Sequence, residues 1–309
     1  MVECTQLIYT TIPQSTRMHT RREGKVSVPG GEVGYSIASG DTPGIPLLLV
    51  HGGPGGSYDA FEPFLSLAQS RPVICYDQLG SYRSPAPVDD SLLSPERFAD
   101  ELHVVRTALT SGRVHILGHS FGAMVLLAYI EKYGQEDIAS LTLAGPLISS
   151  PRWEADQRRL LAGMPPDTRA VIEMHESCEV YDSPAYQEAM MAYYRRHLCR
   201  MDPWPDCLMR MFEYMAAPIY LAMWGPSEFT VRGSLREKNL TNILPELRLP
   251  VLFTCGEFDE ATPQTVRDFA DMTEGAVMKV FAGASHMHFL EAEEEYMAVL
   301  SAFLEGAEQ

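Results

Sequence analysis

The chain has 309 residues, of which 46% are hydrophobic and 21% charged, a composition typical of a soluble globular protein with one large domain or one domain plus an insertion. Its formal net charge of −17 argues against nucleic acid and anionic membranes as partners. No apolar run approaches the ~20 residues of a membrane helix, no secretory signal is predicted, and the cysteines show no C-x-x-C spacing, so we expect a cytoplasmic protein.

Residues 1–56 are predicted to form an arm, a hairpin, a buried strand and a glycine-rich loop. Residues 1–22 carry no clear periodicity and are predicted to form an N-terminal arm. Residues 25–28 and 32–37 alternate apolar and polar side chains around a Pro-Gly-Gly turn, which predicts a β-hairpin. Residues 46–50 form a buried strand that runs directly into residues 51–56, His-Gly-Gly-Pro-Gly-Gly. Because glycine lets a backbone N–H approach a reacting carbonyl, this loop is predicted to supply part of an oxyanion hole.

Residues 114–133 carry the motif around which the rest of the chain is organised. Residues 114–117 form an apolar run suited to a buried strand, residues 118–122 read Gly-His-Ser-Phe-Gly, and residues 123–133 are compatible with a helix. A strand, a G-x-S-x-G turn and a helix in this order predict a nucleophile elbow with Ser120 as the nucleophile. The turn is too sharp for bulky side chains two residues either side of the serine, so glycines stand there.

Short apolar strands alternate with helical segments on both sides of this motif. Ser94-Pro95-Glu96 is a favourable start for a helix that runs to about Leu109, because it combines a capping serine, a proline at the first position and an early acid. The alternation indicates an α/β fold with a mainly parallel central sheet. The further predicted strands are residues 72–76, 138–144, 250–255 and 277–281.

The strand pattern stops at about residue 146 and resumes at residue 250. The segment between is rich in Met, Arg, Tyr, Trp and Glu, and helices are predicted at residues 173–178, 186–198 and 208–217. Because the strands resume afterwards, we interpret this segment as a helical cap inserted into one sheet domain. The predicted domains are a core of residues 23–148 and 246–309, and a cap of residues 149–245.

A nucleophilic serine needs a base, and the position of the histidines narrows the choice. In α/β-hydrolases the catalytic residues follow in the order Ser, then Asp or Glu, then His. Only His286 and His288 lie after the strands that follow the cap. His286, in a loop of small residues, is predicted to be the base, whereas His288 is expected to pack at the start of the last helix. His51 and His119 flank the glycine-rich turns and are interpreted as structural hydrogen-bonding residues.

The base in turn needs an orienting acid, and three carboxyl groups follow the strand at 250–255. Asp259 is the predicted acid, because it lies in the turn at the C-terminal end of that strand, where such sheets place their sites. Glu257 and Glu260 remain alternatives in the same turn.

A serine that attacks a carbonyl group also needs hydrogen-bond donors for the oxyanion that develops on the carbonyl oxygen. The backbone N–H groups of Phe121, directly after the nucleophile, and of Gly53 are predicted to supply them. The predicted chemistry is acyl transfer through an acyl-enzyme. Because the chain has no H-E-x-x-H motif and no clustered Cys/His set, we expect no metal and no cofactor.

Six segments together resemble the proline iminopeptidases, serine aminopeptidases of the α/β-hydrolase fold, and among these the tricorn-interacting aminopeptidase branch. The likeness covers nearly the whole chain beyond about residue 23, and the combination of H-G-G-P-G with Y-D-Q-x-G is more specific than G-x-S-x-G alone. The segments are HGGPGG at 51–56, YDQLG at 76–80, GHSFG at 118–122, YDSPAYQE at 181–188, WGPSEF at 224–229 and GEFDEATP at 256–263.

The resemblance implies the triad Ser120, Asp259 and His286. It also implies that glutamates hold the free N-terminal ammonium of the substrate, and the matching positions here are Glu228 and Glu260. Tyr220 is expected to line the same pocket. The implied partner is a small peptide or amino-acid amide with a free N-terminus, from which one residue is removed at a time.

The leading hypothesis is therefore a serine aminopeptidase, with proline as the first guess for the released residue. An amino-acid amidase or an aminopeptidase of broad apolar preference remains an alternative, as does an esterase or lactonase of the same fold, which would not need the two glutamates. A non-catalytic binding protein is a third hypothesis, disfavoured by the intact Ser, Asp and His. The sequence leaves the physiological substrate, the oligomeric state and the mobility of the cap open.

Overall fold

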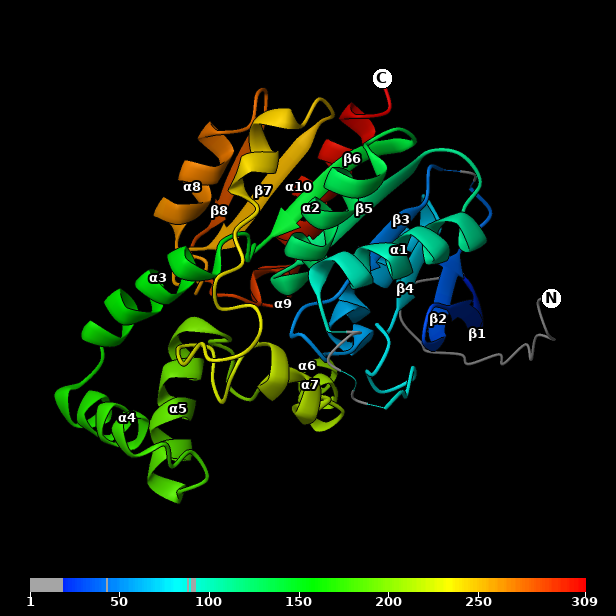
Figure 1. Cartoon of the computed structure of the whole chain (residues 1–309). Helices are drawn as coiled ribbons and strands as arrows, with labels where there is room; N and C mark the ends of the chain where they lie inside the picture. Colours follow the sequence, from blue (N-terminus) through cyan, green and yellow to red (C-terminus); the bar gives the residue numbers. More distant parts are fainter. Residues whose placement is uncertain (1–18, 43, 88, 90–92) are drawn as a thin grey trace.

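The computed structural model describes residues 19–42, 44–87, 89 and 93–309 (Figure 1). Residues 1–18 of the predicted arm lie outside this description. The predicted boundary of the arm at residue 22 is wrong, because residues 20–22 pair with residues 37–39 in the first two strands. The predicted hairpin is confirmed.

An eight-stranded sheet in the order β1-β2-β4-β3-β5-β6-β7-β8 forms the centre of the described structure. The pairs β1–β2 and β2–β4 are antiparallel, and all pairs from β4 to β8 are parallel, which confirms the mainly parallel sheet. The strands are β1 (Thr20–Val28), β2 (Gly31–Ser39), β3 (Leu47–Val50), β4 (Val73–Tyr76), β5 (Val114–His119), β6 (Ile138–Ala144), β7 (Val251–Gly256) and β8 (Val277–Phe281).

Helices cover both faces of this sheet, which is why the parallel strands are apolar on both sides. Along β3, Leu48 and Val50 pack in one apolar cluster with helices α1, α2 and α8, whereas Leu47 and Leu49 pack in a second cluster with η1, α9 and α10. These helices are α1 (Pro95–Leu109), α2 (Phe121–Tyr133), α8 (Pro263–Asp271), α9 (His288–Glu291), α10 (Glu293–Gly306) and the 3-10 helix η1 (Tyr58–Gln69). Helix α1 has the predicted bounds, and Ser94 Oγ accepts a hydrogen bond from the Arg97 N–H.

The helices between β6 and β7 lie together beyond the ends of the strands (Figure 1). The predicted helices correspond to α4, α5 and α6, but α3 and α7 were missed. Helix α3 buries Asp156 and Gln157 beside Trp153 and Leu161, so it has no purely apolar face, and α7 spans less than two turns. The helices are α3 (Ser150–Ala162), α4 (Pro166–Cys178), α5 (Pro184–His197), α6 (Asp206–Glu213) and α7 (Ala217–Met223), followed by the 3-10 helix η3 (Thr241–Glu246).

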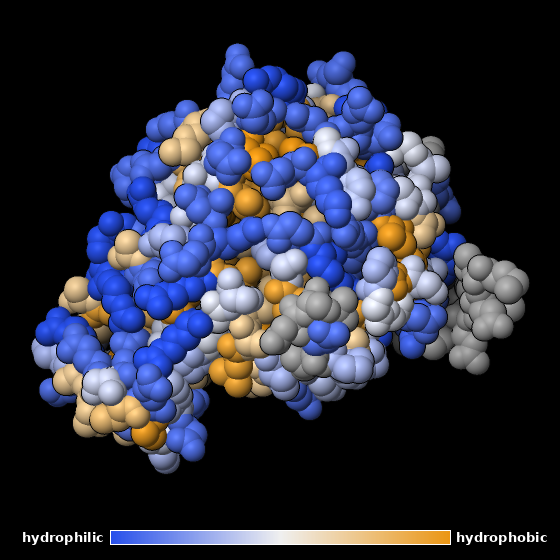
Figure 2. Space-filling model, viewed as in Figure 1, coloured by the Kyte–Doolittle hydropathy of each residue, from blue (hydrophilic) through white to orange (hydrophobic). Residues whose placement is uncertain are grey.

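The surface carries mainly polar side chains on the face drawn in Figure 2, with apolar residues scattered between them. Across the described residues, no helix is long and apolar enough to cross a bilayer. The division into a core and a cap at residues 148–149 and 245–246 stays a prediction.

Candidate active site

Ser120 stands in a sharp turn between β5 and α2. Its backbone has φ 53° and ψ −119°, and its N–H donates to the Ala144 carbonyl at 2.9 Å. A Cβ on Gly118 would lie 2.6 Å from the Gly122 carbonyl group, and a Cβ on Gly122 would lie 2.2 Å from the Val50 oxygen. Neither position can hold a larger residue without movement of the backbone, which is the steric reason that the sequence predicts for the two glycines.

Asp259 and His286 are paired directly. His286 Nδ1–H donates to Asp259 Oδ1 at 2.7 Å, and the carboxylate also accepts from the Ala261 N–H at 2.8 Å and the Gly256 N–H at 3.1 Å. Of the other two acids in this turn, Glu257 accepts from the Gly283 N–H, and neither Glu257 nor Glu260 is hydrogen-bonded to His286 within the described chain. The structure therefore brings together the pair on which the sequence interpretation rested.

The pair is buried, and each member shifts the pKa of the other in favour of the charged form. Burial by itself would raise the pKa of Asp259, but the charge and hydrogen bond of His286 outweigh it, so that pKa lies well below the usual range. Burial by itself would lower the pKa of His286, but Asp259 raises it above its ordinary value. The arrangement fixes the Nδ1–H tautomer and leaves Nε2 to accept a proton.

A cavity of about 160 Å³ opens over Ser120 and His286. One part of its wall is apolar and rich in methionine, and the rest is polar. The lining residues are Gly52, Gly53, His119, Ser120, Met190, Tyr194, Leu198, Met211, Phe212, Met215, Tyr220, Pro226, Glu228, His286 and Met287. Ser120, His286 and Glu228, the first of the two glutamates predicted to bind the ammonium, thus line one cavity.

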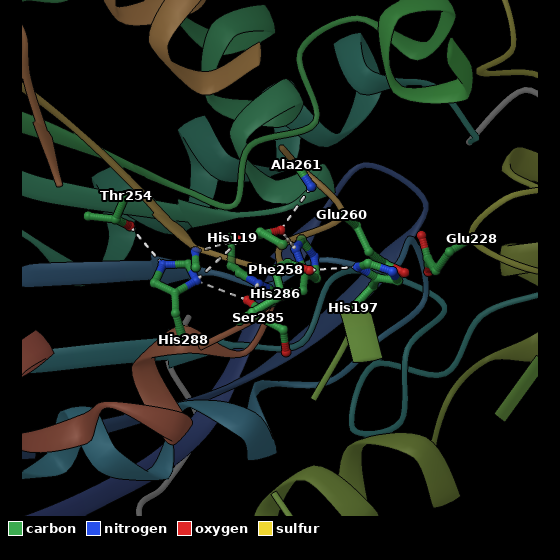
Figure 3. Close-up of polar contacts among 12 residues, drawn as sticks. His119, His197, Glu228, Thr254, Phe258, Glu260, Ala261, Ser285, His286 and His288 are labelled. Carbon is green, nitrogen blue, oxygen red and sulfur yellow. Dashed lines mark hydrogen bonds and ion pairs between the residues drawn. The ribbon is translucent and has the colours of Figure 1, made fainter. Parts of the chain in front are cut away.

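Glu228 and Glu260 form a pair of buried acids near this cavity, and their side chains extend toward one another in Figure 3. Tyr220 Oη donates to Glu228 Oε1 at 2.7 Å. Glu260 is fully buried, and neither of its oxygens has a hydrogen-bond partner in the part of the chain that the structure describes. Burial raises the pKa of both groups, and the negative charges of Glu228 and Asp259 raise that of Glu260 further. In the described part of the chain, no lysine or arginine forms a salt bridge with either acid.

Both predicted oxyanion donors lie beside the nucleophile. Gly53 lines the cavity with φ 114°, and a Cβ on the neighbouring Gly52 would lie 2.9 Å from Ser120 Cβ, so the loop approaches the serine closely. Phe121 is the first residue of α2, and the first N–H groups of a helix have no acceptor within the helix. Both residues are thus next to Ser120, and the role of their N–H groups as oxyanion donors stays a prediction.

The segment 76–80 supports the glycine-rich loop 51–56 through His51, the first residue of that loop. His51 Nδ1–H donates to the Gly52 carbonyl at 2.8 Å, and His51 Nε2 accepts from the Gln78 N–H at 2.9 Å. Gln78 Nε2–H also donates to the His51 carbonyl at 2.8 Å. Burial lowers the pKa of His51, which keeps it neutral for both contacts. These contacts confirm that His51 is a structural hydrogen-bonding residue, and they join the segments 51–56 and 76–80 directly.

Two aromatic residues at the site were missed by the sequence interpretation. Trp153 Nε1–H donates to the Glu228 carbonyl at 3.2 Å, and its ring meets the His286 ring edge to face at 5.6 Å. Tyr194 Oη accepts from the Glu228 N–H at 3.3 Å. Trp153 and Tyr194 reach the site only because α3 and α5 pack beside it. No local motif in either helix indicates that these two residues contact Glu228.

Comparison with known proteins identifies the family. The α/β-hydrolase fold family matches residues 45–293. The chain is 38% identical to a proline iminopeptidase of Heyndrickxia coagulans over 91% of this chain and 98% of that protein. The crystal structure of a proline iminopeptidase of Mycobacterium smegmatis superposes with a TM-score of 0.85 at 33% identity, over 92% of this chain and 98% of the other.

The crystal structure of VinJ superposes with a TM-score of 0.88 at 30% identity, over 92% of this chain and 98% of that one. These relatives match the chain over almost their whole length, so the likeness includes the helices between β6 and β7 as well as the sheet. The chain belongs to the proline iminopeptidase family of α/β-hydrolases.

Proposed function

We propose that this protein is a serine aminopeptidase that releases an N-terminal residue, with proline as the leading candidate, from peptides or amides. The observation that carries the proposal is the fully buried Glu260 carboxyl, unpartnered among the described residues, beside Glu228 at a cavity that also holds Ser120. Buried acids without a cation are costly, and the ammonium group of a substrate offsets that cost. The relatives named proline iminopeptidase support the same activity.

The catalytic steps follow from the positions of three side chains. Ser120 attacks the carbonyl carbon while His286 Nε2 takes the serine proton, and Asp259 stabilises the imidazolium. The N–H groups of Gly53 and Phe121 bind the oxyanion. His286 then gives its proton to the leaving amine, and a water molecule activated by the same imidazole hydrolyses the acyl-enzyme.

The position of the ammonium selects the bond that is cleaved. With the amine between Glu228 and Glu260, and with Tyr220 holding Glu228, the carbonyl of the first residue is the one within reach of Ser120. The enzyme then removes one residue at a time. We further propose that it acts in the cytoplasm on small peptides or amino-acid amides, without a metal or cofactor.

A panel of chromogenic substrates tests the proposal. It contains free prolyl, alanyl, leucyl and phenylalanyl amides, N-acetylated prolyl amide and a short-chain ester. We expect turnover of the free amides and none of the acetylated amide, and the ranking of the four shows whether proline is preferred. Turnover of the ester and the acetylated amide without any demand for a free amine would establish the esterase alternative instead. Comparing a prolyl peptide with prolinamide separates a peptidase from an amidase.

The pH dependence of kcat/KM should report the raised pKa of His286. The imidazole must be neutral to accept the serine proton, so activity rises as pH rises through its pKa. Because Asp259 raises that pKa, the midpoint of the acid limb is expected above the ordinary imidazole value of 6.5. The measurement is kcat/KM for the best free amide between about pH 5 and 9. A flat profile, or a midpoint below the ordinary value, would exclude His286 as the base.

A further inference from the structure

The main-chain carbonyl of His286 is held by two other imidazoles. His119 Nε2 lies 3.2 Å from this oxygen, and His288 Nδ1 lies 3.1 Å from it. His119 precedes Ser120 at the end of β5, whereas His288 begins α9, so the carbonyl lies between two elements (Figure 3). Burial holds the pKa of His119 well below its ordinary value, so His119 is neutral and donates through Nε2–H.

His288 reaches the acid of the triad as well. Its Nδ1 lies 3.5 Å from Asp259 Oδ2, the oxygen that His286 does not use, and its Nε2 lies 2.9 Å from Thr254 Oγ1. The ring is fully buried and packs against Phe281, with ring centres 5.6 Å apart, and Tyr296, with ring centres 5.4 Å apart. It therefore has one orientation, with Nδ1 facing the triad and Nε2 facing β7.

The partners of the two ring nitrogens decide which one carries the proton. A carbonyl and a carboxylate only accept hydrogen bonds, so Nδ1 must be the donor. In a neutral imidazole Nε2 is then an acceptor, and the hydroxyl of Thr254 satisfies it as a donor. The acceptors at Nδ1 thus set the tautomer of His288, and the Thr254 hydroxyl, which can donate or accept, completes it by donating to Nε2.

We propose that His288 is a positioning residue for the Asp259–His286 pair, with Thr254 holding the His288 ring at Nε2. The Nδ1–H of His288 lies beside Asp259 Oδ2, which also accepts from the Gly256 N–H, and it supports the main-chain carbonyl of His286, so both members of the pair keep their relative orientation during proton transfer. The proposal rests on the proposed roles of Ser120, Asp259 and His286, and does not depend on which substrate is cleaved.

The groups that face His288 determine the sign of its effect on pH dependence. They are Asp259 after β7, His286 in the same loop, His119 at the end of β5, and the hydroxyls of Thr254 and Tyr296. Asp259 is the charged group among them. When the Nδ1–H donor is lost, the carboxylate is less stabilised and holds the His286 imidazolium more strongly. The acid limb of the activity profile then moves to higher pH.

Two matched pairs of variants test this role. Thr254→Val removes the hydroxyl at nearly constant volume, and Thr254→Ser keeps it. His288→Gln keeps an amide near the Nε2 position but loses the Nδ1 donor, whereas His288→Asn keeps an amide near the Nδ1 position. Each variant is measured by its rate of labelling with a fluorophosphonate, by the pH profile of that rate, and by its melting temperature.

We expect Thr254→Val and His288→Gln to be labelled about tenfold more slowly, as for the loss of one hydrogen bond to a charged group, with the acid limb shifted to higher pH. Thr254→Ser and His288→Asn should retain most of the rate and the original profile. The proposal would be overturned if the two Thr254 variants were labelled at equal rates and the two His288 variants likewise. It would also be overturned if the acid limb of the labelling profile did not move in folded Thr254→Val and His288→Gln proteins. If a His288 variant does not fold, the comparison of Thr254→Val with Thr254→Ser decides. Labelling needs no free amine, so a failure of the aminopeptidase proposal appears in the substrate panel instead.

Discussion

Ser120→Ala is expected to lower kcat by at least about 10⁴-fold, because the enzyme loses its nucleophile while the cavity and the oxyanion donors remain. Residual activity should come only from binding and from the donors at Gly53 and Phe121. The measurement combines turnover of the best free amide with labelling by a fluorophosphonate, which forms its covalent bond with the nucleophile. The alanine variant should not be labelled, whereas wild type should take up one equivalent.

A serine outside the cavity provides the control for this variant. Ser66 lies in η1, where its hydroxyl donates to the Pro63 carbonyl at 2.8 Å near the surface. Ser66→Ala should turn over substrate and take up label as wild type does. Persistent labelling and turnover of a folded Ser120→Ala protein would mean that another residue is the nucleophile, and the assignment of the elbow would then be wrong.

Glu228→Gln should lower kcat/KM for free-amine amides by about 100-fold, because it removes one of the two charges that offset the desolvation of the ammonium. The glutamine keeps the shape of the side chain and can still accept from Tyr220 Oη, which now bonds Glu228 Oε1 at 2.7 Å. The loss should therefore fall on substrates with a free amine. The readout is the ratio of kcat/KM for free prolyl amide to that for a short-chain ester without an amine.

The control carboxylate comes from the same group of helices. Glu213 is the last residue of α6 and is exposed. Glu213→Gln should leave the ratio of amide to ester kcat/KM unchanged. This control separates the effect of the Glu228–Glu260 pair from that of the overall negative charge of the protein. If Glu228→Gln reduced turnover of amide and ester alike, Glu228 would support the architecture of the site and would not recognise the amine.

The elements near the elbow could be predicted because local chemistry decides them. The glycines at 118 and 122 are required by contacts within a few residues and with the adjacent strand β3, and the cap at Ser94 is a contact over three residues. Helix α3 could not be predicted in the same way. It buries Asp156, whose carboxylate accepts from Thr265 Oγ1, a residue more than a hundred positions further along the chain.

The sequence also left open which of three acids orients His286, because that choice depends on contacts in the folded chain. From the sequence, Glu257, Asp259 and Glu260 are three carboxyl groups in one turn. In the folded chain, Glu257 accepts from Gly283, Asp259 accepts from His286, and Glu260 turns toward Glu228. The three carboxyl groups of this turn thus acquire different partners from their surroundings alone, and burial beside different charges lowers the pKa of Asp259 but raises that of Glu260.

By itself, the sequence determined the order of the strands, the helices α1 and α2, the nucleophile turn and the glycine-rich loop, since these follow from side-chain volume, backbone freedom and hydrophobic period over a few residues. Only the tertiary structure decided that Trp153 lies against His286, that Glu260 is buried with no hydrogen-bond partner among the described residues, and that His288 lies 3.5 Å from Asp259. These relations join residues from separate elements, and their strength depends on burial and on the direction of individual N–H groups. Neither property exists until the helices have packed against the sheet.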